Sequence, residues 1–173
     1  MHTTSRSMKS LLALAVGAML YSGGAMAQIE KADASMLQDI AHANIAEIES
    51  GKLASSKSKD PEVRKFAQMM VADHTKALTD VKKLATEKNV TLPKSPDAMH
   101  KAAMLQLKAL RGNMFDSRYA KQAGVGDHEA TEKLLQTTVA DAKDAEVKAL
   151  ATKMLPVVQA HLAHARELVA TQK

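Results

Sequence analysis

The chain has 173 residues, no cysteine and a formal charge of +5 at pH 7. The lack of cysteine excludes a disulfide framework and a cysteine-linked lipid anchor. Acidic and basic residues are mixed along the chain, so the small positive charge gives no reason to expect a nucleic-acid partner. Ala, Leu, Lys, Glu and Met, which favour helices, are abundant, and no run alternates like a strand. We therefore expect an all-α protein.

The first 27 residues have the organisation of a secretory signal peptide. Arg6 and Lys9 precede an apolar run over 11–20, and Ala25-Met26-Ala27 has the pattern of a cleavage site. About ten apolar residues are too few to cross a bilayer, which takes roughly 20, and no other stretch comes closer. We expect cleavage after Ala27 and a periplasmic domain over residues 28–173, with outer-membrane association as a further expectation. A retained N-terminal anchor is the alternative.

The next segment predicts two long helices, over 33–58 and 61–88. Asp33 is the expected N-cap of the first helix. Asp60 and Pro61 follow it, and this pair suits the N-cap and first position of the second helix. A connection this tight makes the two helices antiparallel neighbours.

The second half predicts one short and two long helices. The short helix is expected from Ser95-Pro96 to Leu110, inside a long link over 89–112. The long helices are expected over 113–142 and 145–172. Gly124 and Gly126 interrupt the first of these, so we expect a kink or bulge there.

Two tight pairs joined by a long link predict a ferritin-like four-helix bundle, whose crossover carries the short helix. At about 1.5 Å per helical residue and about 3.3 Å per extended residue, the link is just long enough to cross the bundle. A plain up-and-down bundle with a decorative loop is the alternative topology.

Four residues with metal-ligand side chains lie near the middles of the four long helices: Glu47, His74, His128 and His161. Helix midpoints meet at one level of a bundle, and bundle metal sites are built from such inward side chains. The pattern predicts a divalent transition metal site for iron, zinc or manganese. A metal-free cluster, in which Glu47 accepts hydrogen bonds from the histidines, is the alternative. Asp73 and Glu129 flank the imidazoles in sequence and suit supporting roles.

The usual di-iron signature is absent, because it needs a carboxylate three residues before each histidine. Val71, Val125 and Val158 occupy those positions. The sequence also has no nucleophile elbow, phosphate-binding loop or HExxH motif, so the motifs lean against an enzyme and leave the question open.

Methionine could supply softer ligands. Met99, His100 and Met104 share the short helix, and thioethers suit Cu(I). Methionines at helical spacing are more typical of core packing, which is the interpretation we prefer.

Five segments of the sequence resemble the exported bacterial proteins grouped as domain of unknown function 4142. They are NIAEIESGKLA (44–54), FAQMMVADH (66–74), FDSRY (115–119), DHE (127–129) and LPVVQAHL (155–162). The resemblance covers nearly the whole of residues 28–173 and implies a ferritin-like bundle without an established activity. Its motif positions fall on the four residues above and on Asp73, Asp116 and Tyr119. Of these, Asp73, Asp116 and Tyr119 are expected to surround the ligands. The Gly124–Gly126 stretch departs from the continuous helix expected of the family.

Two hypotheses for the function follow. The first is an exported metal-binding bundle with a storage, buffering or envelope-stress role. The second is a metal-free structural or interaction module that binds an envelope protein. A metal-using oxidoreductase is a third, less supported by the sequence.

Overall fold

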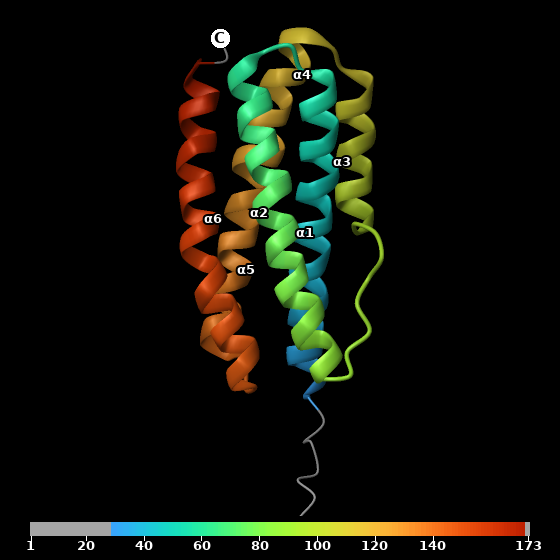
Figure 1. Ribbon diagram of the computed structural model, residues 1–173, viewed down its shortest axis with the longest axis vertical. Helices are drawn as coiled ribbons and strands as arrows, with labels where there is room; N and C mark the ends of the chain where they lie inside the picture. The colour runs from blue at the N-terminus through green and yellow to red at the C-terminus, as the bar shows by residue number, and fades with distance from the viewer. Residues whose placement is uncertain (1–28, 172–173) are drawn as a thin grey trace, which may run out of the picture.

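The computed structural model describes residues 29–171, and this part of the chain is all-helical (Figure 1). The predicted signal peptide and its cleavage site lie outside the described residues. The helices are α1 (Lys31–Lys57), α2 (Pro61–Glu87), α3 (Ala98–Ala109), α4 (Gly112–Tyr119), the π-helix η1 (Ala120–Gly126), α5 (Asp127–Asp141) and α6 (Ala145–Thr171).

The pairing of α1 with α2 agrees with the tight turn between them. Asp60 caps α2, where its Oδ1 accepts hydrogen bonds from the backbone N–H groups of Glu62 (2.8 Å) and Val63 (3.2 Å). The two helices pack closely at Gly51, where a Cβ atom would lie 2.9 Å from the carbonyl oxygen of Ala67. This close approach holds the second half of α1 against the first half of α2.

The predicted N-cap role of Asp33 is wrong. The helix α1 begins at Lys31, so Asp33 lies within its first turn. Its buried carboxylate instead accepts hydrogen bonds from the backbone N–H groups of Lys143 (3.0 Å) and Asp144 (2.6 Å). Asp33 thereby fixes the turn between α5 and α6 to the start of α1, a contact across 110 residues of sequence.

The long link runs beside α1. Gln38 donates to the carbonyl oxygen of Thr91 at 2.9 Å, and Nδ1 of His42 lies 2.9 Å from that of Ser95. In Figure 1, α2 ends at the bottom of the molecule and α4 begins at the top, so the link travels the length of the helices. The short helix starts at Ala98, three residues later than expected, because Asp97 supplies its cap.

The bulge predicted at the glycines is confirmed, because residues 120–126 form the π-helix η1 between α4 and α5. A Cβ atom on Gly124 would lie 3.1 Å from Cβ of Ala165 in α6. The small residue therefore lets η1 pack closely on α6.

The apolar core consists of two clusters along the bundle. One includes Leu37, Ile40, Val81, Leu135 and Leu150. The other includes Phe66, Met70, Phe115, Tyr119 and Leu168. Between the two clusters, the helices contribute polar side chains that are also buried. Within residues 29–171, no helix is both long and apolar enough to cross a membrane.

Candidate metal centre

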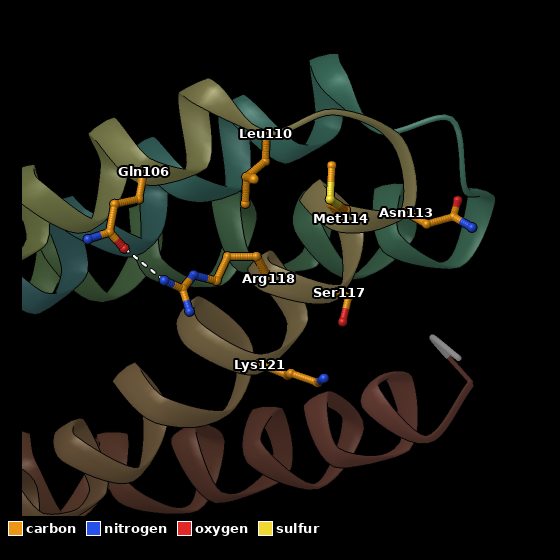
Figure 2. Close-up of a pocket in the computed structure, with 7 residues that line it drawn as sticks. All are labelled: Gln106, Leu110, Asn113, Met114, Ser117, Arg118 and Lys121. Carbon is orange, nitrogen blue, oxygen red and sulfur yellow. Dashed lines mark hydrogen bonds between the residues drawn. The ribbon is translucent and has the colours of Figure 1, made fainter.

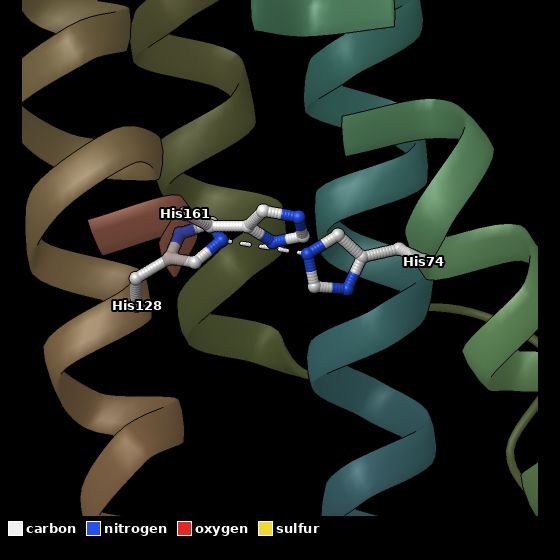
Figure 3. A group of neighbouring side chains, drawn as sticks. All are labelled: His74, His128 and His161. Atoms are coloured by element: carbon white, nitrogen blue, oxygen red, sulfur yellow. Dashed lines mark hydrogen bonds between the residues drawn. The ribbon is translucent and has the colours of Figure 1, made fainter. Parts of the chain in front are cut away.

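Three buried histidines meet in the polar layer between the two apolar clusters. They come from α2 (His74), the first turn of α5 (His128) and α6 (His161), and their exposed fractions are 4%, 1% and 3%. Their ring centroids form a nearly equilateral triangle with sides of 5.4, 5.3 and 5.5 Å. Figure 3 shows the three rings turned toward one another. We call these residues the histidine triad.

Asn44 of α1 fixes the orientation of His74. The Asn44 side-chain amide donates to the carbonyl oxygen of Ile40 at 2.7 Å, which identifies Oδ1 as the atom that faces His74. That oxygen lies 3.0 Å from Nδ1 of His74. Because an amide oxygen only accepts, Nδ1 of His74 carries the proton. Nε2 of the same ring is then an unprotonated lone-pair donor for a metal.

The π-helix η1 fixes the orientation of the His128 ring and the position of its proton, as Asn44 does for His74. Nδ1 of His128 lies 2.9 Å from the backbone carbonyl oxygen of Ala123 in η1, five residues earlier. A carbonyl oxygen can only accept, so this nitrogen donates and Nε2 is left with a free lone pair. The bulge therefore has a local role, since it aims one of its carbonyl groups at the ring.

His161 is held by a carboxylate. Its Nε2 lies 2.9 Å from Oδ2 of Asp73, so Nε2–H donates to the carboxylate and the lone pair is on Nδ1. Nδ1 of His161 is buried and has no hydrogen-bond partner among the residues that the structure describes. A buried acceptor without a partner is unfavourable by about 1–3 kcal/mol.

The ligand nitrogens of the three rings lie close together. Nε2 of His74 and Nε2 of His128 lie 3.4 Å apart, and one ligand atom from each of the three rings lies within 4.8 Å of the others. With both Nδ1 atoms protonated, no hydrogen links the two Nε2 atoms. Two nitrogens that bind one tetrahedral ion at about 2.0–2.1 Å would be about 3.3 Å apart, so this spacing fits a shared metal. Each imidazole also has an outer acceptor, as metal-binding histidines almost always do.

The surroundings keep the triad in the neutral form that binds metals. Burial lowers the pKa of His128 to about 4. Burial also lowers the pKa of His74 well below its usual range, and the neighbouring His128 and His161 lower it further. The pKa of His161 is lowered by burial as well, although the bond to Asp73 opposes the shift.

Glu47, the fourth predicted ligand, lies on the outer side of His128. Its Oε1 is 3.5 Å from Nδ1 of that ring, whereas the converging lone pair of His128 is on Nε2. Burial raises the pKa of Glu47 well above its ordinary value, and the charge of Asp127 adds to the shift. The structure therefore places Glu47 against the triad but outside the group of converging nitrogens.

The other predicted neighbours fall into three environments. Asp73 contacts His161 directly. Glu129 forms an exposed ion pair with Arg166 at 2.9 Å. Asp116 and Tyr119 are buried in α4, and Asp116 Oδ1 and the Tyr119 hydroxyl have no hydrogen-bond partner in the described part of the chain. Burial raises the pKa of Tyr119, with Glu47 as a second cause.

Sequence reasoning did not identify two supports of the triad, Asn44 and the carbonyl group of Ala123. The signal for Asn44 was present, because it lies on the same stripe of α1 as Glu47. The carbonyl group of Ala123 could not be identified from the sequence, because every residue has a backbone carbonyl. The two nearby glycines indicated only that the helix is irregular there.

A groove between α2 and α6 reaches the triad from the surface. It has a volume of about 250 Å³, and His74, His161 and Asp73 are among its lining residues. Val157 and the ion pair between Lys153 and Asp80 lie along the same groove. His128 is not among the lining residues, so the groove opens toward two of the three rings.

Fold and site together define an all-helical protein with a buried three-histidine cluster. The family model named Domain of unknown function (DUF4142) matches residues 19–168, so the chain belongs to that family, as the sequence resemblance predicted. Among solved structures, the chain is similar to "CopM in the Cu(II)-bound form", with a TM-score of 0.68 and 14% identity. The match covers 82% of this chain and 97% of that one, and it supports the helical fold. No curated protein is significantly similar to the chain.

Proposed function

We propose that the protein binds one divalent transition metal ion through Nε2 of His74, Nε2 of His128 and Nδ1 of His161. The observation that carries the proposal is the convergence of three buried lone pairs, each on a ring whose other nitrogen is already hydrogen-bonded. A purely structural cluster would gain nothing from leaving Nδ1 of His161 without a partner.

The ligand set favours copper(II) or zinc over manganese. Imidazole nitrogens suit zinc, copper and iron, whereas manganese prefers oxygen ligands, and the predicted carboxylate ligand Glu47 lies outside the converging group. The similar structure CopM was determined in a Cu(II)-bound form, which supports a metal of this class. A bound cation would favour the ionised form of Glu47, which would then offset part of the charge of the ion through its contact with His128.

The proposed role is metal buffering or carriage in the bacterial envelope, within a ferritin-like four-helix bundle. One buried site in each chain suits reversible binding of single ions better than bulk storage. Three protein ligands leave a coordination position open, and the groove between α2 and α6 would connect it to solvent. Export through the predicted signal peptide would place the protein in the periplasm.

The test is metal analysis of the protein purified without a histidine tag. We expect about one equivalent of zinc or copper after loading and gel filtration, and less than a tenth of that in the His74→Leu and His128→Leu variants. The matched control is His164→Leu, which changes an exposed histidine on α6 next to the site and should keep the metal. Equal metal content in all four proteins, with their helical circular dichroism unchanged, would favour the metal-free module instead.

A further inference from the structure

The positive charge of the described chain is concentrated in one segment, residues 98–126, which covers α3, α4 and η1. The segment contains Lys101, Lys108, Arg111, Arg118 and Lys121, and all five are exposed. Its one acidic residue, Asp116, is buried. The segment thus has a formal charge of +4, from five bases and one acid, whereas residues 29–97 and 127–171 together have 16 bases and 18 acids, or −2.

The same segment exposes large apolar side chains. Met99, Leu105 and Met114 are 72%, 68% and 69% exposed, and Val157 is the fourth exposed large hydrophobic residue in the described part of the chain. The core-packing prediction is therefore right for Met70, which is fully buried, and wrong for Met99. We call the exposed residues of segment 98–126 the α3–η1 face.

A hollow of about 640 Å³ lies within this face, between α3 and the α4–η1 helix (Figure 2). Leu110 and Met114 give it apolar walls, and Arg118 and Lys121 give it cationic ones. Figure 2 shows Arg118 reaching across to α3, where it donates to Gln106 at 2.8 Å. The hollow can therefore receive a ligand that has both an anionic group and an apolar part.

We propose that the α3–η1 face docks on the surface of a membrane that contains anionic lipids, with an acidic headgroup in the hollow. Basic residues near an anionic bilayer are attracted to it, and apolar side chains beside them can enter the boundary with the acyl chains. A bilayer fits this face better than a folded partner does, because the apolar side chains project from two helices and need no complementary shape. The α3–η1 face exposes no aromatic ring for a single-stranded nucleic acid to stack on, since Phe115 and Tyr119, the aromatic residues of segment 98–126, are fully buried.

The orientation that follows keeps the metal centre accessible. In Figure 1, α3 lies on one side of the bundle and α6 on the other. A membrane against α3 would leave the groove between α2 and α6, which leads to the triad, facing the aqueous phase. The docking proposal does not depend on metal binding, and the test can be run with and without a chelator.

The experiment is co-sedimentation with vesicles of phosphatidylglycerol and phosphatidylcholine, compared with vesicles of phosphatidylcholine alone. We expect binding to the anionic vesicles that weakens as salt is raised from 50 to 500 mM, because salt screens the attraction. The variant Lys101→Glu/Arg118→Glu/Lys121→Glu should bind at least about tenfold more weakly. Lys52→Glu/Lys82→Glu/Lys133→Glu has the same change of net charge at exposed positions of α1, α2 and α5, and should keep most of the binding.

A second variant tests the apolar part. Met99→Ser/Leu105→Ser/Met114→Ser should lose the binding that survives at 500 mM salt, while Val157→Ser on α6 should not. All proteins share one N-terminus, so any effect of the leader is common to them. The proposal would be overturned if the two charge variants lost binding equally, or if the wild type bound neutral and anionic vesicles equally. It would also be overturned if the wild type bound no vesicles, and the face would then belong to a protein partner.

Discussion

Each ring of the histidine triad has one nitrogen engaged by the protein and one directed to the centre. The outer acceptors differ in kind: a side-chain amide for His74, a backbone carbonyl for His128 and a carboxylate for His161. The carboxylate is the only one that can carry a full charge, and Asp73 is partly open to solvent. We therefore expect Asp73 to contribute most to the basicity of its histidine.

Asp73→Asn should weaken metal binding by about 10–100-fold, because the hydrogen bond to His161 can remain while the charge behind the ring is lost. Competition with a chromophoric chelator measures the effect. The matched control is Asp80→Asn, two turns along the same helix, which removes an exposed partner of Lys153 and should leave the affinity within about threefold. A similar loss of metal affinity in both variants would show that the negative charge of the groove matters, and not the hydrogen bond between Asp73 and His161.

At the scale of single residues, sequence reasoning located the histidines because buried imidazoles in helix middles are unusual. It could not orient them. Whether a nitrogen points inward depends on the acceptor behind it, and two of those acceptors, the Asn44 amide and the Ala123 carbonyl, were not identified in advance. Glu47 was correctly expected in the core, but its position behind His128 depends on the rotation of α1, which a stripe of residues fixes only coarsely.

At the scale of helices, the position of each element depends on small residues at close contacts. Gly51 permits the approach of α1 to α2, which brings Asn44 within reach of His74. Gly126 has no such role, because a Cβ atom there would meet its nearest neighbour, the carbonyl oxygen of Lys121, at an ordinary 3.6 Å. Its backbone is also helical, with φ −62° and ψ −46°.

The two glycines therefore predict opposite effects of alanine. Gly51→Ala should destabilise the protein by about 1–3 kcal/mol, because its methyl group would overlap a backbone oxygen that cannot move freely. Gly126→Ala should be neutral or should stabilise by up to about 1 kcal/mol, through helix propensity alone. Urea unfolding of the two variants measures both effects, and a stabilised Gly51→Ala protein would show that the helices can separate without loss.

The groove between α2 and α6 gives a kinetic prediction. Val157 is half-exposed on its wall, so Val157→Trp should narrow the groove and slow metal uptake at least several-fold, with the equilibrium affinity little changed. Stopped-flow mixing with metal measures the rate. Ala163→Trp, at an exposed position of α6 away from the groove lining, is the control. Unchanged uptake by Val157→Trp would mean that ions enter elsewhere.

Helix ends were predictable wherever local chemistry decides them, as at Asp60-Pro61. Helix ends were predicted wrongly where contacts with residues distant in sequence determine them. Asp33 has the right side chain and place for an N-cap, but it is used by the turn at Lys143–Asp144, which no local pattern reveals. The glycines predicted an irregularity in the third long helix, over 113–142, but no local pattern identified its form as a π-helix.

At the scale of the whole molecule, the buried ionisable groups predict how the stability of the metal-free protein depends on pH. The triad has lowered pKa values, so below about pH 6.5 the unfolded chain binds protons that the folded protein does not. Stability is then lost as the pH falls, by about 1.4 kcal/mol per pH unit for each histidine, down to its folded pKa. Glu47 acts in the opposite direction, because its raised pKa makes the folded protein bind a proton that the unfolded chain loses above about pH 4.5.

The two effects oppose each other as the pH rises from about 4.5 to 6.5. His128→Leu should make the free energy of unfolding fall less steeply as the pH drops from 6.5 to 4. Glu47→Gln should make it rise more steeply as the pH increases above about 4.5. Urea unfolding at several pH values, with chelator present, measures both. A pH dependence that is the same in Glu47→Gln as in the wild type would contradict the raised pKa of Glu47.

The most direct test of the proposed metal centre is a crystal structure of the zinc- or copper-loaded protein, with diffraction data collected on both sides of the metal absorption edge. We predict one anomalous peak between α2, α5 and α6, about 2.0–2.1 Å from Nε2 of His74, Nε2 of His128 and Nδ1 of His161. A peak elsewhere on the chain, or a loaded crystal with no peak among the three rings, would contradict the assignment of the histidine triad as a metal site.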